Sequence, residues 1–175
     1  TITITGANDA PVITTGLVTG SITETDATIS TTGDFSVADP DASDTVTASV
    51  QSVTIAGSFN GTVPPALTNS SNQQLLGMLS LNPVAGAVLD ADQPTGSDLT
   101  WTFSSAAGGN SAFDFLAKDQ TLELTYNVRL SDNSNGPNND ADTTIVVTVT
   151  GTNDTPEITI DAGNDTGSTT EDLNT

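Results

Sequence analysis

Short acidic and amide side chains gather in the turn-rich segments of this sequence instead of being scattered along its strand-like segments. Asp and Asn in turns are the usual ligands of a hard cation, because Ca²⁺ binds about 6–8 oxygen atoms. Asp and Asn also favour turns for conformational reasons, so a single cluster does not decide between the two explanations. The clusters are Asn8-Asp9, Glu24-Thr-Asp26, Asp39-Pro-Asp41-Ala-Ser-Asp44, Asp132-Asn-Ser-Asn-Gly136, Asp140-Ala-Asp142 and Asn153-Asp154.

The composition leaves few other chemistries open. The chain of 175 residues carries 22 acids against two bases, Lys118 and Arg129, and its formal net charge is −20. Nucleic acid and anionic lipid are therefore excluded as expected partners, because both are bound through clustered Lys and Arg. The absence of Cys and His excludes a disulfide, a thiolate nucleophile, an imidazole base and a soft-metal site. No apolar run approaches the roughly 18 residues of a membrane span, so no membrane insertion is expected.

The segments between the clusters are typical of β-strands, because apolar and polar residues alternate in them. The clearest alternation covers 122–130, and a slip in phase near Gln51 predicts a β-bulge in another strand. About seven such strands in one domain predict an antiparallel β-sandwich. One segment departs from the pattern, since 71–79 is predicted to form a short helix. The other predicted strands are 12–22, 29–37, 46–55, 99–103 and 145–149.

Strands that run up and down a sandwich bring these acidic turns to its two ends. The first pole, where the first strand begins, is expected to collect Asn8, Asp9, Asp39, Asp41 and Asp132. The second pole is expected to collect Glu24, Asp119, Asn153 and Asp154. Carboxylates placed this close together repel one another strongly. A bound divalent ion would convert that repulsion into a cross-link.

The two ends of the chain also resemble each other. The motif Thr-Gly-x-Asn-Asp-x-Pro of residues 5–11 recurs in residues 150–156, 145 positions later. A period of this length corresponds to a whole domain and not to a solenoid unit. We therefore expect the last strand of a preceding repeat and a linker in 1–8, one complete repeat in 9–154, and the first strand of a following repeat in 155–175.

These motifs, together with Val37-Ala-Asp-Pro-Asp-Ala-Ser-Asp-Thr45, Leu99-Thr-Trp-Thr-Phe103 and the segment 113–126, resemble the VCBS-type repeat. That repeat occurs in tandem in very large bacterial surface adhesins, which are often exported by type I secretion. The resemblance covers essentially the whole chain, and the layout is also similar to cadherin domains. It implies a seven-stranded Greek-key sandwich of the cadherin/Ig-like type with one short helix.

The resemblance also implies which residues hold Ca²⁺ between successive domains. It makes Asn8 and Asp9 linker ligands, with Asp39, Asp41 and Asp132 completing the first site. Glu24, Asp119, Asn153 and Asp154 would form half of a second site, whose other half belongs to a following repeat.

We accordingly expect a calcium-stabilised extender repeat, which forms a stiff rod and projects a distal binding domain from the bacterial cell surface for adhesion or biofilm formation. Its expected partners are calcium ions and adjacent copies of the repeat in the same secreted polypeptide, and the segment itself is expected to be monomeric. No enzymatic activity is expected, because the paired acids Asp90 and Asp92, or Asp140 and Asp142, lie in polar turns that do not raise a carboxyl pKa.

The alternative function is a ligand-binding module for a glycan or for ice. Trp101 and Tyr126 are the only large polar aromatic residues available for sugar stacking, and both are in phase with inward-facing residues. The Thr-rich segment 1–5 is too short for the repeated flat array that an ice-binding surface needs.

Overall fold

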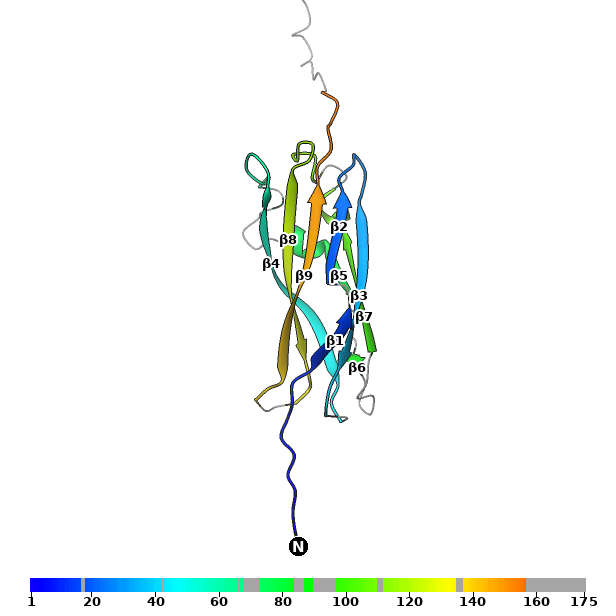
Figure 1. Ribbon diagram of the computed structural model, residues 1–175, viewed down its shortest axis with the longest axis vertical. Coiled ribbons are helices and arrows are strands. Elements are labelled where there is room, and N and C mark those ends of the chain that lie inside the picture. The colour runs from blue at the N-terminus through cyan, green and yellow to red at the C-terminus, as the bar shows by residue number, and fades with distance from the viewer. Residues whose placement is uncertain are drawn as a thin grey trace, which may run out of the picture.

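Two β-sheets packed face to face make up most of the molecule (Figure 1). The computed structural model describes residues 1–16, 18–41, 43–65, 67, 73–83, 87–89, 97–109, 112–134 and 137–156. The chain enters at one end of the sandwich, here called the N-terminal pole, and leaves through 151–156 at the opposite end, the C-terminal pole. The predicted first strand of a following repeat falls almost wholly on 157–175, outside the described residues.

Nine strands are defined within the described residues. One sheet has the order β1-β3-β7-β5, formed by Val12–Gly16, Ser30–Ala38, Ser97–Ser104 and Leu79–Asn82. The other has the order β2-β9-β8-β4-β6, formed by Thr19–Thr23, Asp140–Thr150, Thr121–Ser131, Val46–Ser58 and Ala87–Leu89. The prediction of a β-sandwich is therefore confirmed.

The core lies between the two sheets and follows the alternation in the sequence. Every second residue of β8, from Leu122 to Leu130, is fully buried, and the residues between them face outward. Trp101 and Tyr126 are fully buried as well, as their phase predicts. The predicted bulge is also present, because the register between β4 and β8 shifts between Val50 and Ser52.

The first strand differs from the prediction, because it is divided between the two sheets. β1 pairs with β3 in antiparallel fashion, whereas β2 lies beside β9 in parallel register, so the sandwich is not antiparallel throughout. Two parallel strands run in the same direction, so they end on the same side of their sheet. The ends of β2 and β9 therefore meet at the C-terminal pole, where the amide of Glu24 donates a hydrogen bond to the carbonyl of Thr150 at 2.8 Å.

The short helix is confirmed, but it is shorter than predicted. The helix α1 covers Gln73–Gly77, and Leu79 already belongs to β5, while residues 71 and 72 lie outside the described part of the chain. The buried hydroxyl of Tyr126 donates a hydrogen bond of 2.9 Å to the carbonyl of Leu75 and so ties the helix to β8. A second short element, the 3-10 helix η1, covers Ser105–Gly108.

The indole of Trp101 fills the space over two glycines, one from each sheet. A Cβ atom at Gly33 would lie 2.6 Å from Cζ2 of Trp101, and one at Gly20 would lie 2.8 Å from Cη2 of the same ring. Distances below 3 Å between such atoms require one of the groups to move. Glycine at these positions is therefore needed for the packing of the largest core side chain.

Replacing Gly33 with alanine is expected to destabilise the fold, because the added methyl group overlaps the buried ring of Trp101. Overpacking of this kind lowers the free energy of unfolding by about 1–3 kcal/mol. Urea denaturation measures the change. Gly77→Ala is the matched control, because a Cβ there would meet Ala107 at an ordinary 3.6 Å. Equal stability of Gly33→Ala and the unmodified chain would contradict this packing.

Candidate metal centres

Two loops at the N-terminal pole are shaped by their own aspartates. After β3, the amide of Asp41 donates to Oδ1 of Asp39 at 2.9 Å. After β8, the amide of Ser134 donates to Oδ1 of Asp132 at 2.8 Å. An Asp side chain that accepts a hydrogen bond from the backbone two residues later forms an Asx turn. Both turns thus hold a carboxylate at the end of a strand.

The linker that enters the domain is bound to these two loops. The side-chain amide of Asn8 donates to Oδ2 of Asp132 at 3.1 Å and to the carbonyl of Asn138 at 2.8 Å. The backbone amide of Asp9 donates to Oδ2 of Asp41 at 2.7 Å. The predicted meeting of Asn8, Asp9, Asp39, Asp41 and Asp132 at one pole is therefore what the structure shows, while their role as metal ligands remains a prediction.

Asp39 is the acid of this group that is buried with one carboxylate oxygen lacking a hydrogen-bond partner among the described residues. Its side chain is 2% exposed, and its Oδ2 atom has no hydrogen-bond partner among the described residues. Burial raises the pKa of Asp39, against the hydrogen bond from the amide of Asp41, and the nearby charges of Asp132, Asp44 and Asp41 raise it further. One carboxylate oxygen from each of Asp39, Asp41 and Asp44 lies within 4.8 Å of the others.

Asp132, in contrast, is well supplied with donors. It is also buried, with 6% of its surface exposed, and burial alone would raise its pKa. Hydrogen bonds from Ser134 and Asn8 outweigh that effect, so the pKa of Asp132 is lowered. The pole therefore combines one carboxylate stabilised in its charged form with another that lacks partners.

Glu24 holds the outgoing linker at the C-terminal pole. It is 1% exposed, and its Oε2 atom accepts hydrogen bonds from the amide and the hydroxyl of Thr152, at 2.8 and 3.0 Å. Its Oε1 atom is buried and has no hydrogen-bond partner among the described residues. One oxygen of this carboxylate thus binds the linker, and the other has no hydrogen-bond partner among the described residues.

Asp26 and Asp114 stand beside Glu24. One carboxylate oxygen from each of the three acids lies within 4.8 Å of the others. The Oδ1 atom of Asp114 is buried without a hydrogen-bond partner in the described part of the chain. Burial raises the pKa of Asp114, and the charges of Glu24, Asp154 and Asp26 raise it further.

The structure does not bring all predicted residues into these clusters. Asp119 lies in a turn with φ 66°, where its amide donates to the carbonyl of Gly151 at 3.1 Å, and its carboxylate belongs to neither cluster of described acids. Asn153 and Asp154 are exposed on the linker and line, with Glu24, a cleft of about 300 Å³.

Three acids of the clusters were not among the predicted ligands: Asp26, Asp44 and Asp114. Asp26 and Asp44 belong to acidic turns that the sequence already shows. The sequence gives less indication that Asp114 is a ligand, because it is a single acid inside the apolar segment 112–116. Phe113 and Leu116 on either side of it are buried, and they fix the turn that carries Asp114.

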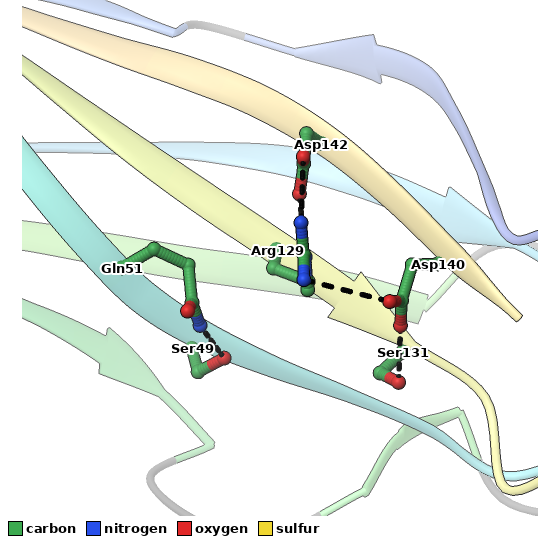
Figure 2. Close-up of polar contacts among 6 residues, drawn as sticks. All are labelled: Ser49, Gln51, Arg129, Ser131, Asp140 and Asp142. Carbon is green, nitrogen blue, oxygen red and sulfur yellow. Dashed lines mark hydrogen bonds and ion pairs between the residues drawn. The ribbon is translucent and has the colours of Figure 1, made fainter.

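The two basic side chains of the protein do not neutralise these clusters. Arg129 lies on the outer face of the five-stranded sheet, where Figure 2 shows its guanidinium between Asp142 and Asp140. Nε and Nη2 donate to Asp142 at 2.8 and 3.0 Å, and Nη1 is 3.6 Å from Asp140. These are the only ion pairs among the described residues, and Lys118 is exposed without one.

The donor sets at both poles fit a hard divalent cation. They offer carboxylate oxygens, some of them buried and unpartnered, and no nitrogen or sulfur ligand. Ca²⁺ bonds oxygen at roughly 2.3–2.6 Å, so oxygens up to about 4.8 Å apart can share one ion.

No helix within the described residues is long and apolar enough to cross a membrane.

Comparisons with known proteins give similarities in structure only. No family model matches the chain, and no curated protein matches it. Three solved structures are similar to it: the ASH/PapD-like domain of human CEP192 (PapD-like domain 7), the CooA pilin subunit of enterotoxigenic Escherichia coli, and AggA, the major subunit of aggregative adherence fimbriae type I from Escherichia coli.

These similarities are distant. The first has 10% identity and a TM-score of 0.43 over 89% of this chain and 94% of that chain. The second has 12% identity and a TM-score of 0.41 over 79% and 92%. The third has 11% identity and a TM-score of 0.40 over 85% and 99%. Values this low carry no argument about function.

The variant Asp39→Asn is expected to change thermal stability in opposite directions with and without calcium. In EDTA it removes a buried charge that its neighbours repel, so the melting temperature should rise, by about 2–4 °C. In millimolar calcium it removes a ligand, so the melting temperature should fall below that of the unmodified chain. Differential scanning calorimetry in the two buffers tests this, and a change of the same sign in both would contradict a metal role for Asp39.

The metal-free protein should gain stability from two of its acids as the pH falls from neutral towards the ordinary carboxyl pKa of 3.8. The folded chain binds protons on Asp39 and Asp114 at a higher pH than the unfolded chain, because both pKa values are raised above 3.8. This contribution to stability is therefore complete below that value and is lost as the pH rises through the folded pKa. Urea denaturation of dialysed, metal-free protein measures it, and stability that falls steadily over this range would contradict the assignment.

Proposed function

We propose that this chain is a calcium-stabilised extender repeat of a secreted bacterial surface adhesin, similar to the VCBS-type repeat. With Ca²⁺ at its poles it forms one unit of a stiff rod, which holds a distal binding domain away from the cell. Its partners are the neighbouring repeats of the same polypeptide and the ions between them. The role is mechanical and not enzymatic.

One observation carries this proposal. At each pole a nearly fully buried carboxylate, Asp39 or Glu24, keeps one oxygen without a hydrogen-bond partner among the described residues. Burying a charge is unfavourable unless it is paired or bound to a metal. Since Arg129 pairs with Asp140 and Asp142, and Lys118 is exposed and forms no ion pair among the described residues, a cation from solution is the remaining source of positive charge.

Rod formation follows from where the linkers attach. Asn8 and Asp9 are bound to loops of the N-terminal pole, and Thr152 is bound to Glu24 at the C-terminal pole. An ion that ligates both the loops and the linker removes the bending freedom of a short connection. Repetition of this arrangement along a tandem array gives a stiff extended chain.

The tandem organisation, with a complete repeat in 9–154, is supported by the environments of equivalent residues. Ile2 and Ile4 are 92% and 91% exposed, whereas their counterparts Val147 and Val149 in β9 are fully buried. This difference is expected if residues 1–8 contain the last strand of a preceding repeat and a linker. The two linkers also share a local contact, because Asn8 donates to the carbonyl of Asp9 at 3.4 Å and Asn153 to that of Asp154 at 3.2 Å.

The strand order supports the finer assignment to a seven-stranded Greek-key sandwich of the cadherin/Ig-like type. An immunoglobulin constant-type sandwich has strands A, B, E and D in one sheet and C, F and G in the other. The orders β1-β3-β7-β5 and β9-β8-β4 correspond to these sheets. In this assignment β2 is the second half of the first strand and β6 is an addition.

The alternative of a glycan-binding module finds less support. Sugar recognition commonly uses an exposed aromatic face, and Trp101 and Tyr126 are fully buried. A glycan array probed with the isolated chain distinguishes the two functions, since the extender role predicts no signal.

Calcium is expected to raise the melting temperature of the 175-residue chain, because the ion binds only the folded state. At a calcium concentration of about 100 times the Kd, the stabilisation is about 2.7 kcal/mol, which corresponds to roughly 5–10 °C for a protein of this size. In a polypeptide of two tandem repeats, small-angle scattering should show a longer maximum dimension with calcium than with EDTA. Sodium chloride at equal ionic strength controls for general screening of the charge. Unchanged melting and unchanged dimensions would together refute the proposal.

A further inference from the structure

We infer that a single domain supplies all the carboxylate ligands of the cation site at the C-terminal pole, namely Glu24, Asp26 and Asp114. Glu24 is also a positioning residue, because its second oxygen holds the linker at Thr152. This inference rests on the proposed function for the presence of a cation, but it names a different ligand set from the one that the family resemblance implies, which has Asp119 in place of Asp26 and Asp114.

Two independent observations support the ligand set. The three carboxylates approach within 4.8 Å of one another, although they come from two separate segments of the chain. In addition, Oε1 of Glu24 and Oδ1 of Asp114 are both buried without a hydrogen-bond partner among the described residues. Carboxylate oxygens that are removed from water and close to like charges are unfavourable unless a proton or a cation neutralises them, and a cation can bridge all three groups.

The surrounding structure holds these acids in place before any ion binds. Glu24 is fixed by its backbone bond to Thr150 and follows the parallel pairing of β2 with β9. Asp114 is fixed by the burial of Phe113, which packs against Phe103 with ring centroids 6.2 Å apart, and of Leu116. The ion would therefore join two loops of one domain and would not need a following domain for its carboxylates.

Glu24 connects this site to the direction of the linker. Its Oε2 atom binds the amide and hydroxyl of Thr152, so a cation that fixes the carboxylate also fixes the first residues of the linker. The adjacent cleft of about 300 Å³, which Asn153 and Asp154 also line, leaves space for the water molecules or linker oxygens that complete a shell of about 6–8. A hard divalent cation of the size of Ca²⁺ fits this arrangement.

The test compares Asp114→Asn with Asp119→Asn in the 175-residue chain. Both changes remove one carboxylate from the same loop, so each controls for the other. Calcium titration calorimetry should show one site weakened at least about tenfold in Asp114→Asn, because ligand charge sets the affinity of such sites. Asp119→Asn should bind calcium as the unmodified chain does. In EDTA, Asp114→Asn should melt higher than the unmodified chain, which also shows that this variant folds.

Hydrogen exchange at the amide of Thr152 provides a second measurement, which reports on the linker and not on calcium affinity. Calcium should slow this exchange at least about tenfold in the unmodified chain and in Asp119→Asn, but not in Asp114→Asn. Loss of the calcium site in Asp119→Asn, or unchanged binding and exchange in Asp114→Asn, would overturn the inference while leaving the extender function intact. No calcium binding by the unmodified chain would instead refute both.

Discussion

Asp39 and Glu24 are carboxylates that the fold removes from water at its two ends without giving either a positively charged partner. Only a proton or a cation can neutralise them. Burying a charged group without a partner is unfavourable, and burial raises the pKa of Asp39. A domain is stable by only about 5–15 kcal/mol, so such a penalty matters. A bound divalent ion would remove this penalty and add bonds between the loops.

The sandwich determines where this chemistry takes place. The strands β8 and β9 each span 11 residues, which at about 3.3 Å per residue separates the poles by roughly 36 Å. This distance exceeds the Debye length of about 8 Å at physiological salt, so the charges of one pole hardly affect the other. The two poles are therefore expected to bind ions independently, and changes at the two ends should be additive.

Much of the fold could be predicted because its signals are periodic. The alternation in 122–130, the bulge near Gln51 and the inward phase of Trp101 all appear in the structure as expected. The division of the first strand could not be predicted, because pairing of β2 with β9 in parallel register leaves no mark in the alternation of either strand. The helix was placed correctly, but its end was not, since Leu79 packs in the core equally well from a helix or a strand.

The acidic sites, like the fold, could be predicted from the sequence only in part. The N-terminal pole was predictable, because Asp39 and Asp132 follow directly after strands and Asp41 lies two residues beyond Asp39. Strand direction alone brings such residues together. At the C-terminal pole the sequence predicts Asp119, whereas the acid of this loop that lies within 4.8 Å of Glu24 and Asp26 is Asp114. Which acid of the 112–120 segment faces Glu24 depends on the burial of Phe113 and Leu116, a tertiary effect that spacing does not reveal.

A crystal structure of this chain grown in calcium, with anomalous diffraction to locate the ions, tests the central claim most directly. The account predicts anomalous density at both poles, at roughly 2.3–2.6 Å from oxygen atoms of Asp39 at one end and Glu24 at the other. Water alone at both positions, with the carboxylates turned away from one another, would contradict it.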